Sequence, residues 1–184
     1  MIVAIIPAKG GSSRLPNKNI APLNGRPMMD YTIMEAKRSK RIDEIYVSTD
    51  NDEIAENAEK NNVKVIRRPS SLGGDVPIVD VYRHAIEQLN NPDIKIVIGL
   101  QPDHPDRDMS VDEVLKIFEE EGVDRLLSEE ADSTKNGAHF IMSRHFVDTD
   151  EIRKEIYIVD DCTNVHYQAD LEAASSRLIA RNKD

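Results

Sequence analysis

The chain has 184 residues, of which 39% are hydrophobic and 32% charged, and its formal net charge is -10 at pH 7. This composition is typical of a globular domain, and the negative charge argues against a nucleic-acid or anionic-membrane surface, because both require a positive face. The single cysteine, Cys162, excludes a disulfide within the chain and favours a reducing cytoplasm.

Short apolar runs alternate with amphipathic stretches. The first run ends at Pro7 without a basic leader, which favours a buried strand over a signal peptide, and no run approaches the roughly 20 residues that span a bilayer. The predicted strands cover residues 3–6, 44–48, 63–66, 95–100, 125–127, 138–142 and 155–159. Helices are expected to begin near residues 27, 50, 77, 110 and 168, with caps at Asp50 and Ser110. This alternation predicts one α/β domain over residues 1–184, with a mostly parallel sheet covered on both faces.

Ligands of such sheets bind beyond the carboxyl ends of the strands, so the segments that follow the strands are candidate sites. Residues 8–19, AKGGSSRLPNKN, follow the first strand. Gly10 and Gly11 allow the backbone to approach a ligand, and successive amides there can form an anion-binding nest. Arg14 and Lys18 add positive charges that suit phosphate oxygens. The stretch favours a polyphosphate site; the alternative is a flexible polar turn, since neither standard nucleotide-loop motif is matched.

Three later segments add polar groups at the same edge. Asp50 follows the second strand, where it either caps the next helix or contacts a ligand. Arg68 lies in the glycine-containing segment 67–75 after the third strand. Gln101 and Asp103 follow the fourth strand, and Asp103 either binds a divalent cation such as Mg²⁺ or is a turn residue beside prolines.

Several stretches together carry a family resemblance. IIPAKGGSSRLPNKNIAPLNGRPMMDYTI resembles the opening of the cytidylyltransferases that activate acidic sugars, the acylneuraminate cytidylyltransferase and CMP-KDO synthetase family. VSTDNDEIAENAEKNNVKVIRRPSSLGGD and NGAHFI resemble later parts of the same proteins. The similarity covers most of residues 2–101, with patches to about residue 175. It implies a Rossmann-like three-layer sandwich of the nucleotide-diphospho-sugar transferase type. It also implies transfer of CMP from CTP to a small acidic acceptor, release of pyrophosphate, Mg²⁺ or another divalent cation, and a homodimer.

The resemblance also implies roles for individual residues. The positions that match the triphosphate loop are Ala8, Lys9, Gly10, Gly11, Ser12, Arg14, Lys18 and Asn19. Arg68 matches the arginine near the base, Gln101 the glutamine beside the nucleotide, and Asp103 the metal-binding aspartate of the KDO branch. In the implied reaction Arg14 and Lys18 hold the phosphates, while Mg²⁺ on Asp103 polarises the α-phosphate.

The chain departs from the family near its C-terminus. Asn164 and His166 occupy the positions of two metal-binding aspartates, and His166 is a poor ligand for Mg²⁺, which prefers oxygen. His166 could bind a metal, hydrogen-bond the substrate, act as a base or make a structural hydrogen bond. Asp160 and Asp161, just upstream, could supply the missing charge.

A second departure is a segment between Asp108 and Asn136 that is short compared with the family. The acceptor pocket is therefore expected to be smaller, more open or completed by another chain. Two alternative functions stay open. One is a nucleotidyltransferase of the same fold that uses another nucleotide, like a molybdopterin guanylyltransferase or a sugar-phosphate nucleotidyltransferase. The other is a catalytically degraded nucleotide-binding regulator, which the replacements at Asn164 and His166 motivate.

Overall fold

The computed structural model describes residues 1–74 and 76–181, so that Asp75 in the predicted segment 67–75 lies outside the described residues. The strands of the central sheet are β1 Ile2–Pro7, β4 Glu44–Thr49, β5 Lys64–Arg67, β6 Ile96–Gly99, β7 Arg125–Glu129, β8 Lys135–Ser143 and β9 Glu155–Val159. The helices are α1 Met29–Arg38, α2 Asp52–Lys60, α3 Ile78–Leu89, α4 Val111–Glu121, α5 Arg144–Thr149 and α6 Gln168–Arg181. None of these helices combines the length and the apolar character that a bilayer crossing needs.

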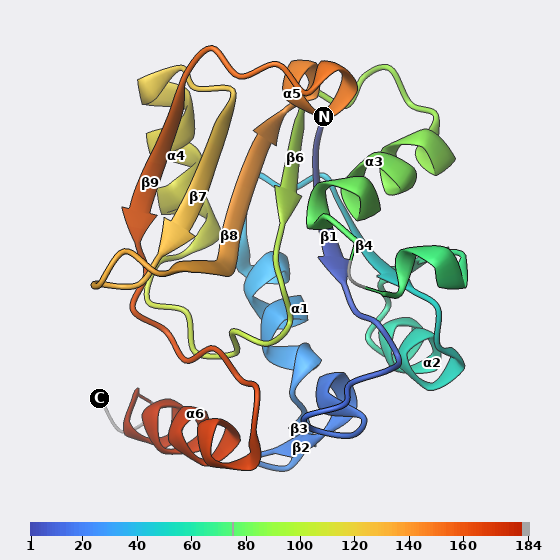
Figure 1. The fold of residues 1–184 in the computed structure, drawn as a ribbon, viewed down its shortest axis with the longest axis vertical. Helices are drawn as coiled ribbons and strands as arrows, with labels where there is room; N and C mark the ends of the chain where they lie inside the picture. Colours follow the sequence, from blue (N-terminus) through green and yellow to red (C-terminus); the bar gives the residue numbers. More distant parts are fainter. Residues whose placement is uncertain (75, 182–184) are drawn as a thin grey trace.

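The seven strands form one sheet in the order β5-β4-β1-β6-β8-β7-β9 (Figure 1). Strand β8 runs antiparallel to β6 and β7, and every other neighbouring pair is parallel. The predicted mostly parallel sheet is therefore confirmed. Because β8 is reversed, its first residues lie beside the carboxyl end of β6, where the amide of Gln101 donates to the carbonyl of Gly137 at 3.0 Å.

Helices cover both faces of the sheet, as the alternation of strands and helices predicts. Successive residues of a strand point to opposite faces, so that Ala4 and Ile6 of β1 pack with α1, α2 and α4, whereas Val3 and Ile5 pack with α3 and α5. Burial of an isoleucine such as Ile5 or Ile6, both 0% exposed, contributes about 1.5–3 kcal/mol. Helix α6 lies apart from these layers, against the segment that follows β1 (Figure 1).

The structure corrects some local predictions. The cap of α2 is Asn51, whose side chain accepts the amide of Ile54 at 3.0 Å, and not Asp50. Ser110 and Glu113 form the expected capping box of α4. The first helix begins later than predicted because a short hairpin precedes it, with strands β2 Pro22–Leu23 and β3 Arg26–Pro27. Helix α5 and the single turns Lys18–Ile20 and Ser70–Leu72 were not predicted either.

Candidate active site

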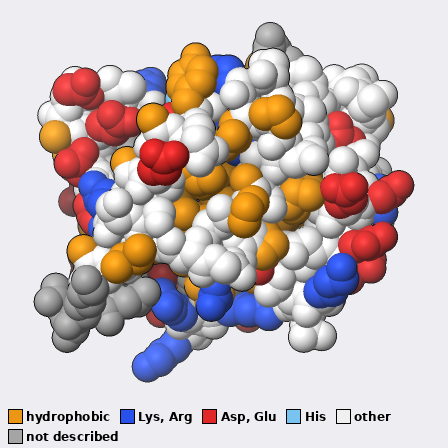
Figure 2. Space-filling view, turned by 90° about the horizontal axis from the view of Figure 1, so that it is seen from below, with side chains coloured by type: hydrophobic (Ala, Val, Ile, Leu, Met, Phe, Trp, Pro, Cys, Tyr) orange, Lys and Arg blue, Asp and Glu red, His pale blue; other side chains and the backbone are white. Residues whose placement is uncertain are grey.

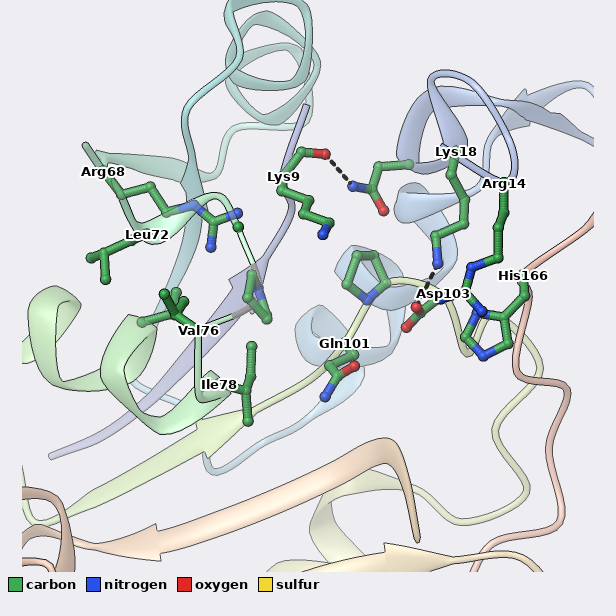
Figure 3. A pocket seen from close by; sticks show the side chains of 15 residues that line it. Lys9, Arg14, Lys18, Arg68, Leu72, Val76, Ile78, Gln101, Asp103 and His166 are labelled. Atoms are coloured by element: carbon green, nitrogen blue, oxygen red, sulfur yellow. Dashed lines mark hydrogen bonds and ion pairs between the residues drawn. The ribbon is translucent and has the colours of Figure 1, made fainter. Parts of the chain in front are cut away.

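A cavity of about 290 Å³ opens beyond the carboxyl ends of β1 and β6 (Figure 3). Its wall is formed by the segments that follow β1, β5 and β6, by the start of α3 and by one residue that precedes α6. The lining residues are Pro7, Lys9, Arg14, Lys18, Asn19, Arg68, Leu72, Gly74, Val76, Ile78, Val81, Gln101, Pro102, Asp103 and His166.

The two ends of this cavity differ in chemistry. Arg14, Lys18 and Asp103 gather at one end, and Val76 and Ile78 lie at the other (Figure 3). Seen from below, hydrophobic side chains gather at the centre of this face of the molecule, and Lys and Arg side chains lie along its lower margin (Figure 2). The arrangement suits a ligand that has an anionic chain at one end and a less polar ring at the other.

The loop at residues 8–19 presents side chains to the cavity more than backbone. Lys9, Arg14, Lys18 and Asn19 line the cavity as predicted. The side chain of Asn19 donates to the carbonyl of Lys9 at 2.9 Å, which fixes the loop across its base. Positive charge in this loop is therefore held close to the strand end, in an otherwise acidic chain.

Four predicted residues of the same loop do not line the cavity. Ala8 is fully buried in the core, and its amide donates to Ser48 at 2.9 Å. The amide of Gly10 donates to the carboxylate of Asp50 at 2.9 Å. Gly11 and Ser12 are also absent from the wall. The Gly10 amide, expected in an anion-binding nest, is thus occupied by Asp50 in this structure.

Asp103 is the carboxylate of the cavity. Lys18 Nζ lies 2.7 Å from its Oδ2 and also donates to the carbonyl of Val165 at 2.9 Å. Burial by itself raises the pKa of Asp103, but His104 and Lys18 beside it outweigh that effect and hold the pKa well below its usual range. Asp103 therefore stays ionised at neutral pH, ready to attract a cation.

Arg68 and Gln101 lie between the two ends of the cavity. Arg68 is only 7% exposed, and its Nε has no hydrogen-bond partner among the described residues. Burial lowers the pKa of Arg68, although the charge of Asp50 opposes the shift. A buried donor without a partner costs free energy, so this edge of the guanidinium is suited to an acceptor atom of a ligand.

His166 reaches the cavity from the segment that precedes α6. Its Nδ1 is buried and has no partner among the described residues. Burial lowers the pKa of His166, and the nearby charges of Lys18 and Arg14 lower it further. The ring is therefore neutral at pH 7. Asp170 holds this segment in place, since its carboxylate accepts the amides of His166 and Tyr167, each at 2.8 Å.

The predicted metal ligands are not all brought together. Asp160 is 0% exposed and faces the interior, where it contacts His139 at 3.0 Å and accepts the amide of Asp108 at 2.9 Å. Burial raises the pKa of Asp160, but these hydrogen bonds prevail and lower it to about 2. Asp161 is exposed and does not line the cavity, so that only Asp103 and His166 share it.

A divalent cation fits this site only with help from a ligand. In the part of the chain that the structure describes, no group of three or more His, Cys, Asp or Glu side chains could hold a metal. Mg²⁺ commonly takes one or two carboxylates and completes its shell with water and phosphate oxygens. Asp103 can supply one such carboxylate, and His166 is a poor oxygen substitute.

A second, more open cavity of about 550 Å³ adjoins the first and shares His166 with it. It is lined by Glu130, Thr134, Cys162, Thr163, Asn164, His166, Tyr167, Asp170 and Arg177. The Oδ1 atom of Asn164 is buried there without a partner among the described residues. This space is large enough for a second small molecule next to the anionic end of the first cavity.

The sequence did not point to the apolar part of the wall or to His104. Leu72, Val76 and Ile78 precede or begin α3, where apolar residues are also expected for core packing. His104 follows Asp103 directly and is 1% exposed. The signal that could have found it is its position beside a candidate carboxylate at a strand end.

Comparison with known proteins gives a consistent result. A family model described as cytidylyltransferase matches residues 3–177. The 8-amino-3,8-dideoxy-manno-octulosonate cytidylyltransferase of Shewanella woodyi is 38% identical over 120 residues, which are 64% of this chain and 47% of that protein. The chain thus spans about half the length of the curated relatives it matches.

Two solved structures have a similar fold. CMP:2-keto-3-deoxy-manno-octonic acid synthetase complexed with CTP has a TM-score of 0.76 at 17% identity, over 98% of this chain and 99% of that one. Rv0371C of Mycobacterium tuberculosis H37Rv, complexed with manganese, has a TM-score of 0.69 at 12% identity, over 95% and 98% of the two chains. At these identities the likeness concerns the fold, and it confirms the expected three-layer α/β architecture.

Proposed function

Since this chain belongs to the cytidylyltransferase family, we propose that it transfers CMP from CTP to the hydroxyl of an acidic sugar of the octulosonate type. The proposal treats residues 1–184 as one nucleotidyltransferase domain that acts in the cytoplasm. The curated relatives are named for such an acceptor, and a similar fold has been solved with CTP. A homodimer, which the family resemblance implies, stays a prediction.

The observation that carries the proposal is the charge distribution of the 290 Å³ cavity. Lys9, Arg14 and Lys18 line it in a chain whose net charge is -10, and Asp103 lies at the same end. This pattern supports a bound triphosphate more than an uncharged ligand, because concentrated positive charge attracts phosphate oxygens. The less polar end, with Arg68 and Gln101 nearby, is suited to the base and ribose.

The reaction is nucleotidyl transfer. A hydroxyl oxygen of the acceptor forms a bond to the α-phosphorus of CTP, the bond from that phosphorus to the bridging oxygen breaks, and pyrophosphate leaves. The hydroxyl proton passes to a base or to water. The barrier arises largely from charge on the phosphoryl oxygens, so positioning and electrostatic stabilisation supply most of the rate acceleration.

In this proposal the chain's own residues have separate tasks. Arg14 and Lys18 hold the β- and γ-phosphates and stabilise the departing pyrophosphate. A divalent cation, when bound, supplies positive charge at the phosphate oxygens, and Asp103 is the carboxylate that would hold it. The second cavity, on the far side of His166, takes the acceptor, and His166 lies between the two substrates.

The test is pyrophosphate release from CTP with Mg²⁺ or Mn²⁺ and a panel of acceptors. We expect turnover with 3-deoxy-manno-octulosonate or its 8-amino derivative, and little with N-acetylneuraminate. The acceptor-free reaction and the same panel with GTP, UTP and ATP serve as controls. Turnover with GTP in place of CTP would favour a guanylyltransferase of the same fold and contradict the proposal.

A nucleotide-binding protein without turnover is the second candidate. It is favoured by the absence of a multi-carboxylate metal group among residues 1–74 and 76–181, and by Asn164 and His166 at the positions of aspartates in the family. A thermal-shift measurement separates the two, because CTP binding raises the melting temperature in both cases. Stabilisation by CTP without pyrophosphate release across the whole panel would favour this second candidate.

A further inference from the structure

His104 has a ring whose two nitrogens face different partners. The side chain is 1% exposed, and its Nε2 accepts a hydrogen bond from the amide of Gly137 at 3.3 Å. An imidazole nitrogen that accepts a hydrogen bond carries no proton, so the neutral ring must carry its proton on Nδ1. The backbone of β8 therefore selects the tautomer of a residue in the turn after β6.

The protonated nitrogen faces Asp103. His104 Nδ1 lies 3.1 Å from Asp103 Oδ1, and neither atom has another hydrogen-bond partner among the described residues. The other oxygen of the carboxylate, Oδ2, is 2.7 Å from Lys18 Nζ. The carboxylate is thus approached from two sides, by a mobile ammonium on one oxygen and by a buried ring on the other.

We propose that His104 is a positioning residue for Asp103. The amide of Gly137 sets the tautomer, and the Nδ1–H group of His104 donates to Oδ1 and keeps the carboxylate turned toward the cavity. His104 itself does not line the cavity, so it acts through Asp103 and does not touch the substrate. The inference rests on the proposed function, in which Asp103 lies beside the phosphates of the nucleotide.

The asymmetry of the two contacts on Asp103 gives His104 its purpose. Lys18 is on a flexible stem and is also a candidate phosphate ligand, so a nucleotide can draw it away from Oδ2. His104 is buried and held by backbone, so its contact with Oδ1 persists when Lys18 moves. Asp103 would otherwise be free to rotate at the moment when its charge is needed.

Gly137 links this arrangement to the nucleotide side of the site. A side chain at this position would place its Cβ 2.1 Å from Cδ of Gln101, and the carbonyl of Gly137 accepts the amide of Gln101. One residue of β8 thus fixes both the glutamine that lines the cavity and the histidine behind the carboxylate. This explains why a glycine is needed at the second position of the stretch NGAHFI.

Two substitutions separate the two nitrogens of the ring. In His104→Asn the side-chain amide can place a donor where Nδ1 lies, and in His104→Gln it can place an acceptor where Nε2 lies. We expect His104→Asn to keep kcat within about threefold of the wild type, whereas His104→Gln lowers kcat about ten- to hundredfold, the effect typical of losing a hydrogen bond to a charged group. KM for CTP changes little in both, because neither touches the nucleotide. Equal kcat values for the two variants, at equal melting temperatures, would overturn the proposal.

A second measurement does not depend on turnover. The ¹⁵N chemical shifts of the imidazole ring of His104 in the ligand-free protein, at a pH of about 8, report which nitrogen carries the proton. We expect a protonated Nδ1 and an unprotonated Nε2, and the opposite tautomer would overturn the proposal even if a variant fails to fold. An inactive wild type would instead overturn the proposed function, and the tautomer would still decide the role of His104.

Discussion

Two parts of the site behave differently with respect to their sequence. The cationic segment 8–19 and the strand end at Asp103 place their charged side chains around one cavity, as expected. The segment that precedes α6 contains adjacent acids, Asp160 and Asp161, of which one is buried against His139 and the other is exposed. In the first part charge gathers for a ligand, and in the second part most of it serves the fold.

The difference has a simple physical origin. The first segment is a loop between a strand and a hairpin, so several consecutive residues can turn toward the same space. The second leaves the edge strand β9, where successive side chains point in opposite directions. Two neighbouring acids therefore cannot both reach the cavity, and proximity in sequence to a motif is weak support for a shared metal.

The largest effect is expected for Lys18→Ala. Removal of one well-placed donor to the transition state typically lowers kcat about 10²–10³-fold, and Lys18 also holds Asp103 and the carbonyl of Val165. The measurement is kcat and KM for CTP, together with the melting temperature. Lys60→Ala, at an exposed lysine of α2, is the matched control. Unchanged kinetics in Lys18→Ala would contradict the assignment of the first region as the phosphate site.

The next effect compares the two adjacent acids. Asp160→Asn is expected to lower the free energy of unfolding by about 1–3 kcal/mol, because a buried carboxylate with several hydrogen bonds loses its charge. Asp161→Asn is expected to change it by less than about 0.5 kcal/mol, as is usual at exposed positions. Urea denaturation measures both. Equal effects of the two variants would remove the distinction drawn between them.

A smaller effect is expected from His166→Asp. This change places a second carboxylate beside Asp103, and Mg²⁺ prefers oxygen ligands, so the Mg²⁺ concentration for half-maximal turnover should fall about tenfold. Gln168→Asp adds the same charge at an exposed position nearby and is the control. If both variants respond equally to Mg²⁺, general electrostatics and not a new ligand explains the result.

The smallest effect is the acid dependence of stability. The pKa of Asp160 is about 2 in the folded protein and about 4 in an unfolded chain, so the folded state binds its proton less tightly. The contribution of this group to stability is full above about pH 4 and is lost as the pH falls toward 2. The stability difference between the wild type and Asp160→Asn should therefore narrow over that interval, by at most about 1.4 kcal/mol per pH unit. A constant difference would show that Asp160 is not stabilised as a carboxylate.

Much of the fold could be predicted because the hydrophobic pattern determines it. The expected strand at residues 155–159 coincides with β9, and the capping box at Ser110 is present. The β2–β3 hairpin was missed although its signal was there: Asn24 and Gly25 have φ angles of 49° and 84°, the left-handed geometry that an Asn-Gly turn favours. The role of Asp50 was missed because a cap and a loop contact look alike in sequence, and only the fold brings Gly10 within reach.

The candidate site was predictable where one segment carries it, and less so where two segments must meet. Lys9, Arg14 and Lys18 follow one strand and could be found together. The contact between His104 and Gly137 joins residues 33 positions apart. No local pattern reports such a contact, because it depends on the order and direction of strands in the sheet.

The reversed direction of β8 has a wider consequence for reading chains of this architecture. In a parallel strand the ligand edge is reached at the finish, so a search downstream of each strand finds what lies there. An inverted neighbour delivers its opening residues to that edge instead, as Gly137 illustrates. Anyone scanning such proteins for determinants of substrate choice should therefore also look upstream of the inverted strand.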